Sequence, residues 1–503
     1  MKTKKAFYNI ISELTFEVVA LICGLILPRM VLEAYGSAYN GVIQTIIQFL
    51  GYVEILTIGV TGPTRVAVYR ALAKQDEHKL HAILKANDAY MRKVGGALVI
   101  YMVLLAGIYP YLVREQFSWW EVASLVLIIG TGELMEYVFG CSSRTLLKAD
   151  QRTYIYTLLM IGSKIASTLI AAFLVYRHFG IHTVRLAMVA CFAAAPILTD
   201  VITKTKYHIN SKVKPDYSAL EHRRDAIAHS IAGMVNDSTP TLLLALLTNP
   251  ITVSIYSVYD LILGNILKIQ KAFTSNLEGA FGEFWAKGEK EKFREKLNTL
   301  EYLMFVFLLL IYTTTGTLLL PFMELYTADI TDANYILPCF AVLFTCCTAA
   351  YSLRTPYVLA VQAAGKYRET RNMATREAVL NVSISLIGTC IWGLNGVVVG
   401  SLAANLYRTF SFARYTYRTM LDIPMTQFVS RFAWMLASGA VIVAVQLFII
   451  QNILEINSWF QWAGAGVICV IAASVLIVIS SVLFYKQELQ NSLQLGRVML
   501  SRK

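Results

Sequence analysis

The stretch that decides the fold is Gly36–Leu84, GSAYNGVIQTIIQFLGYVEILTIGVTGPTRVAVYRALAKQDEHKLHAIL. It is a long apolar run, interrupted by Glu54 and followed by a basic amphipathic tail. The same design returns 213 residues later at Thr274–Leu297, TSNLEGAFGEFWAKGEKEKFREKL. The identical pairs at that offset are Thr61/Thr274, Ala67/Ala280, Ala73/Ala286, Lys74/Lys287, Lys79/Lys292 and Leu84/Leu297. An apolar run and a charged tail that repeat together predict two similar halves.

Composition places the chain in a membrane. Hydrophobic residues make up 56% of the 503 residues and charged residues only 15%, whereas soluble domains carry about 25% charged residues. A net charge of +12 could indicate nucleic acid, but that function needs basic residues clustered on one folded surface. Here they lie in short segments between apolar runs, so the sequence predicts a polytopic all-α membrane protein without a nucleic-acid partner.

Fourteen apolar runs are long enough, or nearly so, to cross about 30 Å of hydrocarbon, which takes about 20 helical residues. The predicted spans are 9–29, 41–66, 94–111, 119–141, 154–176, 184–203, 226–247, 252–275, 300–320, 337–363, 377–392, 397–413, 432–451 and 461–485. Of the 44 Lys and Arg residues, only Arg114 and Arg177 fall in the loops opposite the N-terminus. By the positive-inside rule, both termini are then cytoplasmic.

A second repeated segment sets the predicted boundaries of the halves. Asp150–Arg152 and Lys366–Arg368 each precede a span, and residues after them align at an offset of 216. The predicted lobes are therefore residues 1–212 and 213–425, with two further spans and a tail in 426–503. Six spans is an even number, so both lobes enter the membrane in the same orientation. Their pseudo-twofold axis is expected along the membrane normal, with the substrate path between them.

Known catalytic and metal motifs are missing from the sequence. The eight cysteines lie in membrane runs without metal-ligand spacing, and the seven histidines form no HExxH motif. No Walker loop or dinucleotide fingerprint is present. The loops are too short to hold a catalytic domain. We therefore expect neither an enzyme nor a resident cofactor or metal.

Ionisable residues inside the spans are the informative ones, because a charge at the centre of a span costs about 2.5–3.5 kcal/mol and usually faces a wet cavity or a partner. Lys164 lies mid-span and shares a face with Ser167 and Thr168; a cavity and an ion pair both explain it. Asp237 lies beside Pro240, which cannot donate to the carbonyl of residue 236. Two interpretations of Asp237 remain open: a Na⁺ or proton site, and a kinked helix in which the carboxylate is simply solvated.

Four more charged residues belong to the same group. Asp260 and Lys268 share one face of the span 252–275, and Glu54 falls within one position of Lys268 in the repeat. A Glu54–Lys268 pair could close one side of the path. Arg29 lies at the outer end of the first span, where snorkelling explains it as well as a ligand role.

Arg354 lies about nine residues, or roughly 13 Å, from the end of the span 337–363. At that depth its side chain is too short to reach the membrane surface. A guanidinium binds phosphate oxygens bidentately, so a phosphate-bearing headgroup is one interpretation. The other is an ion pair with an acid such as Glu377 or Glu136.

Several segments carry a resemblance to a known family. They are YGSAYNGVIQTIIQFL (35–50), ALAKQDEHKL (71–80), LLKADQRTYI (146–155), RTPYVLAVQAAGKYRETRNMATREAVLNVSISLIG (354–388) and GLNGVVVGSLAAN (393–405). Together they resemble the bacterial polysaccharide-biosynthesis flippases, which share a superfamily with multidrug extruders and the lipid II flippase. The resemblance spans residues 1 to about 420 and implies a two-lobed fold of fourteen helices in the bacterial inner membrane.

The resemblance also implies a function and partners. An undecaprenyl-pyrophosphate-linked oligosaccharide would move from the cytoplasmic to the outer leaflet by alternating access, beside membrane lipid and other polysaccharide-assembly proteins. The candidate substrate-binding residues are Arg29, Lys164, Lys268 and Arg354, and the candidates for Na⁺ or proton coupling are Glu54, Asp237 and Asp260. A multidrug or small-molecule antiporter is the alternative within the superfamily. A membrane glycosyltransferase or polymerase is the alternative outside it, and would need a larger outer loop.

Overall fold

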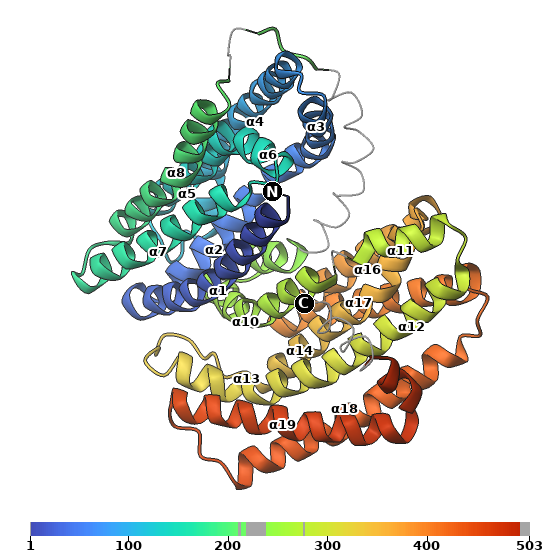
Figure 1. Cartoon of the computed structure of the whole chain (residues 1–503). Helices are drawn as coiled ribbons and strands as arrows, with labels where there is room; N and C mark the ends of the chain where they lie inside the picture. Colours follow the sequence, from blue (N-terminus) through green and yellow to red (C-terminus); the bar gives the residue numbers. More distant parts are fainter. Residues whose placement is uncertain (1, 210–212, 218–237, 275–276, 493–503) are drawn as a thin grey trace. The chain divides into compact units, whose positions relative to one another are not determined.

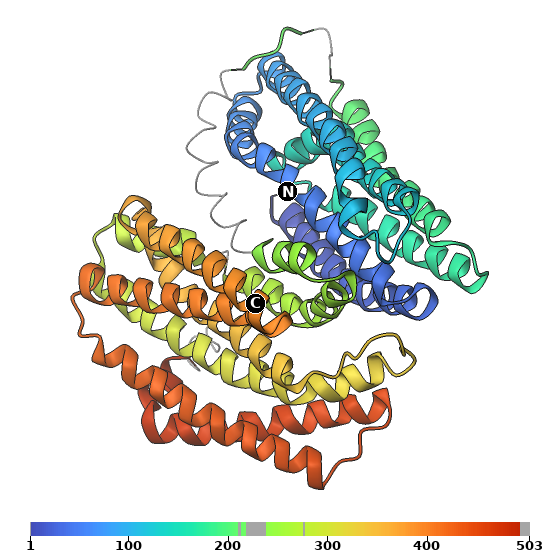
Figure 2. The ribbon, with the colours of Figure 1, turned by 180° about the vertical axis from the view of Figure 1, so that it is seen from behind.

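The computed structural model describes residues 2–209, 213–217, 238–274 and 277–492. All regular secondary structure in these residues is helical (Figure 1). The chain packs into two compact units, Met1–Val258 and Tyr259–Lys503. The reverse view in Figure 2 shows the long antiparallel helices within each unit. The predicted class of an all-α polytopic membrane protein is confirmed.

The N-terminal unit is built from long helices joined by short turns. They are α1 (Lys2–Tyr35), α2 (Ser37–Gly51), α3 (Ile55–Ala73), α4 (Glu77–Leu112), α5 (Trp119–Met135), α6 (Cys141–Ala149), α7 (Tyr154–Tyr176) and α8 (Ile181–Lys206), with a helix described over Ser238–Leu247 and the start of α10 (Pro250–Thr274). The core lies mainly between α2, α4 and α5, where Ile46, Leu98 and Val126 are fully buried. Packing of these apolar faces, rather than propensity, keeps the helices together.

The C-terminal unit repeats this construction. After the rest of α10 come α11 (Leu277–Ala286), α12 (Lys290–Phe307), α13 (Thr313–Tyr326), α14 (Pro338–Leu353), α15 (Thr355–Ala363), α16 (Tyr367–Trp392), α17 (Leu394–Tyr415), α18 (Thr426–Asn452) and α19 (Trp459–Phe484). A π-turn, Leu308–Tyr312, joins α12 to α13 within one continuous helical rod. The core of the C-terminal unit includes two buried clusters, one around Phe293 and one around Phe305.

Nine helices in the described part of the chain are long and apolar enough to cross a membrane. They are Phe7–Tyr35, Glu77–Leu112, Trp119–Ala149, Tyr154–Tyr176, Ile181–Lys206, Pro250–Lys271, Lys290–Tyr326, Thr426–Asn452 and Trp459–Phe484, and each contains or closely matches one predicted span. Among the other five, the predicted helix 226–247 is described only from residue 238. The spans 377–392 and 397–413 lie within α16 and α17, and α16 begins with a charged segment.

Two predicted spans are broken rather than continuous. The span 41–66 is divided into α2 and α3 by a short turn of 3-10 helix at Tyr52–Glu54. The span 337–363 is divided into α14 and α15 at Arg354, two residues before Pro356. Proline cannot donate to the carbonyl of Ser352, and the side-chain amide of Gln270 donates to that oxygen instead, at 3.1 Å. The break therefore leaves no unsatisfied carbonyl at this position.

The predicted domain boundaries at 212/213 and 425/426 follow the sequence repeat, whereas the compact units divide at Val258. The reason is local packing onto α2. Ser238 accepts a hydrogen bond from Gln48 at 2.8 Å, and Ser254 accepts one from Asn40 at 2.8 Å. A Cβ added to Gly41 would lie 1.7 Å from the carbonyl oxygen of Pro250. Residues 238–258 therefore pack with the N-terminal unit.

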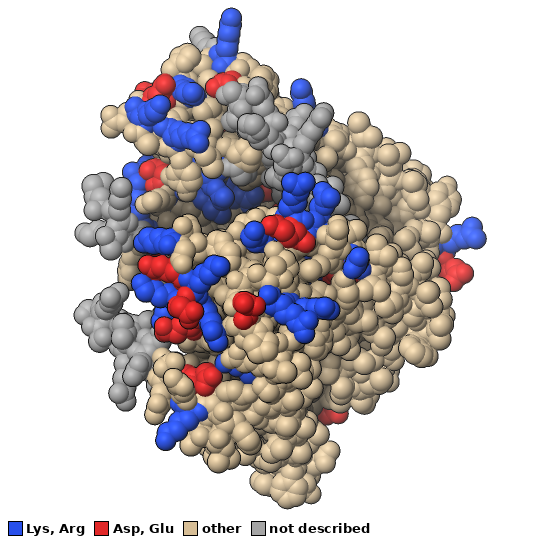
Figure 3. Space-filling model, turned by 90° about the vertical axis from the view of Figure 1, so that its right-hand side faces the viewer, with Lys and Arg blue, Asp and Glu red and all other residues tan. Residues whose placement is uncertain are grey.

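The helix surfaces are strongly apolar. Figure 3 shows broad areas free of Lys, Arg, Asp and Glu, with the charged side chains gathered elsewhere on the same face. On α19, Phe460 is 89% exposed and Leu483 71% exposed. Apolar patches of this extent are unfavourable in water and require lipid or a partner, so these helices lie in a membrane.

Candidate functional site

A buried charged cluster lies in the C-terminal unit, where α16 and α17 pack as a tight hairpin beside the α14–α15 break. Glu377 of α16 places Oε1 2.5 Å from Nη1 of Arg354, and its Oε2 accepts a hydrogen bond from Nη1 of Arg408 on α17. One carboxylate is thus shared by two arginines. We call Arg354, Glu377 and Arg408 the arginine cluster.

The arginine cluster lies deep within the helices. Its three members are seven to ten residues from the helix ends at Ala363, Tyr367 and Tyr415, or about 10–15 Å at 1.5 Å per residue. The side chain of Glu377 is 3% exposed, and those of Arg354 and Arg408 are 12% and 14% exposed. Within the described contacts, two guanidiniums share this one carboxylate at membrane depth.

Aromatic rings hold the cations in place. The guanidinium of Arg354 lies 3.6 Å from the ring centre of Tyr351, and that of Arg408 lies 4.4 Å from Phe412. The ammonium of Lys271, on α10, lies 5.1 Å from the same Tyr351 ring. Cation–π contacts of this kind fix orientation as well as adding attraction. The cluster is therefore preorganised and carries a third cation at its edge.

The ion pair expected as the alternative interpretation of Arg354 is present, and Glu377 is its partner. Glu136, the other acid considered, lies 3.1 Å from Arg144 in the N-terminal unit. Pairing with Glu377 does not decide the phosphate role, because that one carboxylate is divided between two guanidiniums. Headgroup binding by Arg354 stays a prediction.

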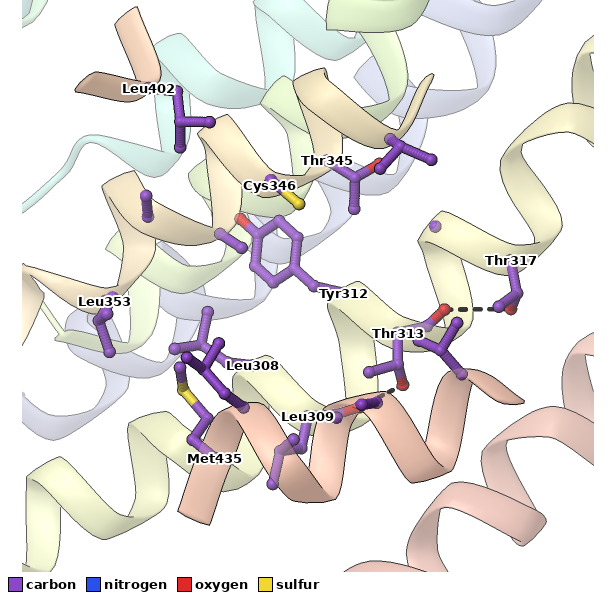
Figure 4. A pocket seen from close by; sticks show the side chains of 18 of the residues that line it. Leu308, Leu309, Tyr312, Thr313, Thr317, Thr345, Cys346, Leu353, Leu402 and Met435 are labelled. Atoms are coloured by element: carbon purple, nitrogen blue, oxygen red, sulfur yellow. Dashed lines mark hydrogen bonds between the residues drawn. The ribbon is translucent and has the colours of Figure 1, made fainter. Parts of the chain in front are cut away.

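An apolar pocket of about 710 Å³ lies in the same unit, between the rod α12–α13 and helices α14, α17 and α18. Figure 4 shows the ring of Tyr312 reaching toward Cys346, with Leu308, Leu309 and Met435 on the side of α18. Leu353 lines the pocket and immediately precedes Arg354 in the chain. The pocket and the arginine cluster thus share helices α14 and α17, which places a polar site and an apolar site on neighbouring parts of one unit.

Two candidate cations of the N-terminal unit also have contacts. Arg29 pairs with Glu33, one helical turn later on α1, at 2.6 Å. The ammonium of Lys164 lies 5.4 Å from the ring of Phe192 on α8. The polar face expected around Lys164 is packed, because Ser167 and Thr168 are buried and their hydroxyls donate to the Lys164 carbonyl. Substrate binding by Arg29 and Lys164 stays a prediction.

The remaining candidates are placed as follows. Glu54 is exposed in the turn between α2 and α3, and Asp260 and Lys268 are exposed on α10. Lys268 donates to Asn265 at 3.3 Å. Asp237 lies outside the described residues. Glu54 belongs to one compact unit and Lys268 to the other, so their pairing stays a prediction. Within the described ranges, no three His, Cys, Asp or Glu side chains gather as a metal site would require.

Sequence reasoning missed Arg408 and Lys271. Arg408 lies inside the predicted span 397–413, and a charged residue within an apolar span is itself a reason to expect a functional or paired residue there. Its partner could not be inferred, because the pairing joins residues 31 positions apart on two helices. Lys271 lies near the end of α10 and resembles a snorkelling residue.

A second buried carboxylate lies in the same unit and also escaped prediction. Glu301, which is 1% exposed, accepts hydrogen bonds from the hydroxyls of Tyr357 and Tyr417 and from Arg431. Arg431 also contacts Glu488 at 3.1 Å. This network joins α18 to α12 and α15, and its charges include two acids and one arginine.

Comparisons with known proteins agree with this fold. No family model and no curated protein sequence matches the chain. The fold is similar to "Lipid II flippase MurJ, inward closed conformation", with a TM-score of 0.72 and 13% identity over 95% of this chain and 99% of that one. It is also similar to an inward-facing multidrug resistance MATE family transporter of the MOP superfamily (TM-score 0.58, 13% identity, 79% of this chain and 96% of that one).

A third similar structure is the Vibrio cholerae MATE transporter VcmN in the bent form (TM-score 0.50, 15% identity, 82% of this chain and 93% of that one). At these identities the likeness concerns the fold alone. The chain is a multi-pass membrane protein with the fold of MOP-superfamily flippases and exporters. The fold that the sequence resemblance implied is thereby confirmed.

Proposed function

We propose that the protein is a flippase that moves a polyprenyl-pyrophosphate-linked oligosaccharide between membrane leaflets. The observation that carries the proposal is the arginine cluster, in which two guanidiniums share one carboxylate, beside an apolar pocket in a fold similar to that of a lipid II flippase. A pyrophosphate favours cationic donors, and planar guanidiniums bind its oxygens bidentately; a polyprenyl chain suits an apolar groove. A drug antiporter for cations would favour excess acid at such a site.

The proposal also includes the direction of transport and the membrane in which it takes place. Transport runs from the cytoplasmic to the outer leaflet of the bacterial inner membrane, for surface polysaccharide assembly, with both termini in the cytoplasm. Two compact units suit alternating access by rocking. Coupling to a Na⁺ or proton gradient through Glu54, Asp237 and Asp260 belongs to the same proposal, as does headgroup binding by Arg29, Lys164 and Lys268.

Reconstituted vesicles test the function. The probe is a polyprenyl-pyrophosphate oligosaccharide with a fluorescent sugar, whose outer-leaflet fraction is measured with a membrane-impermeant quencher. We expect Arg354→Ala and Arg408→Ala each to lower the initial translocation rate about a hundredfold, since a charge-assisted hydrogen bond contributes about 1.5–3 kcal/mol. Arg354→Lys should recover only part of the rate, because lysine lacks the planar fork.

Lys287→Ala is the control, because Lys287 is exposed and pairs with Glu283 one helical turn away; its rate should equal that of the wild type. Each variant is checked for an unchanged melting temperature. Wild-type translocation by both folded arginine variants would rule out the headgroup role of the cluster. Absence of translocation by the wild type would rule out the flippase function for this substrate.

A further inference from the structure

We propose that Glu377 is an exchangeable counter-anion, which occupies the two arginines until the pyrophosphate of the substrate replaces it. The inference rests on the proposed function and adds a regulatory role to the same site. Glu377 would thereby set both how tightly the site binds an anion and how readily it releases one.

Charge supports exchange rather than permanent pairing. Glu377 carries one negative charge, and its two oxygens are divided between Arg354 and Arg408. Both arginines use Nη1 for this contact. Nε of Arg408 is buried and has no hydrogen-bond partner among the described residues. A pyrophosphate brings more charge and more acceptor oxygens than a carboxylate, and planar guanidinium forks bind phosphate oxygens bidentately.

The arginines have support that does not depend on Glu377. Tyr351 and Phe412 contact the two guanidiniums through their ring faces. Nη1 of Arg354 also donates to Asn405 at 3.4 Å. Both arginine side chains are more exposed than that of Glu377, which is 3% exposed. An incoming anion can therefore meet guanidiniums that are already in position.

The network around Glu301 provides the contrast. Glu301 accepts from two tyrosines and an arginine, and Arg431 has Glu488 and Asn298 as further partners. Among the described contacts, two acids face one arginine here, whereas two arginines share one acid in the arginine cluster. The Arg431 side chain is only 5% exposed. This network resembles the arginine cluster in burial and in residue types, but it should not exchange its carboxylate for a soluble anion.

The test uses the purified full-length chain in detergent, with inorganic pyrophosphate as the probe and chloride at equal ionic strength as its control. In buffer without polyvalent anions, Glu377→Gln should have a lower melting temperature than the wild type, because two buried guanidiniums lose their counter-charge. Pyrophosphate should restore most of that loss. Calorimetry should show pyrophosphate binding to Glu377→Gln about tenfold more tightly than to the wild type, since a competing anion has been removed.

Glu301→Gln is the matched control, and it should lose melting temperature without recovering it in pyrophosphate. Glu377→Asp, which keeps the charge on a shorter side chain, should show an intermediate response to pyrophosphate. It replaces Glu377→Gln in the test if Glu377→Gln does not fold. Adding Arg408→Gln to Glu377→Gln should abolish the pyrophosphate effect. Equal responses of the Glu377 and Glu301 variants, or no response from either Glu377 variant, would overturn the proposal.

Vesicle translocation separates this inference from the proposed function. Glu377→Gln should bind more tightly but translocate more slowly, because release then lacks its internal competitor. If the arginine variants abolish translocation while Glu377→Gln shows no tighter binding, the flippase function stands and the exchange role of Glu377 fails. If Glu377→Gln binds pyrophosphate more tightly while the wild type translocates nothing, the anion site stands and the flippase function fails.

Discussion

At the scale of single residues, Asp150 organises one end of the N-terminal unit. It follows α6 and accepts hydrogen bonds from Lys5 of α1 at 2.9 Å and from Tyr207, just after α8, at 2.5 Å. Nε of Arg152 lies 2.8 Å from the same carboxylate. Burial raises the pKa of Asp150, but these hydrogen bonds and charges outweigh burial and hold that pKa below its ordinary value. Asp150 thus connects the turn after α6 to α1 and to the end of α8, which are distant in sequence.

The depressed pKa of Asp150 gives a pH-dependent contribution to stability. The contribution is fully present above the unfolded-state pKa of about 3.9 and is lost as the pH falls through the lower folded-state pKa. Asp150→Asn should therefore melt at a lower temperature than the wild type at pH 7, and the difference should shrink as the pH falls below about 4. Melting curves of both proteins across that range measure it. A difference independent of pH would show that charge is not the cause.

At the scale of elements, the α16–α17 hairpin positions the arginine cluster. Gly393, with φ of +55°, forms the turn, a backbone conformation that other residues rarely adopt. Along the hairpin, a Cβ on Gly396 would lie 1.9 Å from the carbonyl oxygen of Gly388. Small residues at a helix contact let two backbones approach closely within a membrane. That approach brings Glu377 and Arg408 within hydrogen-bonding distance.

A larger residue at this contact should separate the two helices. Gly396→Leu is expected to destabilise the protein by about 3 kcal/mol or more, because backbone rather than a flexible side chain blocks the new atoms. It should also lower translocation by disturbing the Glu377–Arg408 pair. Gly464→Leu is the control, because a Cβ there meets nothing within 4 Å. Melting temperatures of the two variants make the comparison, and equal losses would contradict the close packing.

At the scale of the whole molecule, the fold is similar to those of a lipid II flippase and a MATE transporter, and the proposed transport function rests on that likeness. Two helical units and broad apolar surfaces match the fold of MOP-superfamily flippases and exporters. What separates a flippase for anionic lipids from a drug exporter is then the charge buried inside the units. In the C-terminal unit, two guanidiniums of the arginine cluster share one carboxylate among the described contacts, and the proposal of an anionic substrate rests on this arrangement.

The orientation of the chain in the membrane can be tested at the scale of the whole molecule. Reporter fusions after Lys212 and after Lys503 should give a cytoplasmic signal, and fusions near Asp329 an external one, because Lys and Arg are concentrated on the side of the N-terminus. Paired phosphatase and fluorescent-protein fusions measure this in cells. A cytoplasmic signal at Asp329 would invalidate the fourteen-span map and the pseudo-twofold expected from the repeat.

The sequence by itself determined the membrane class, the helical fold and nine of the spans, because long apolar runs have one stable form in lipid: every backbone group must be satisfied within the segment. It also identified Arg354 as a buried charge with two interpretations. Only tertiary structure decided which acid Arg354 contacts, that Arg408 shares it, and that Glu301 is buried among tyrosines. Such contacts join helices distant in sequence, and neither hydropathy nor spacing encodes which faces meet.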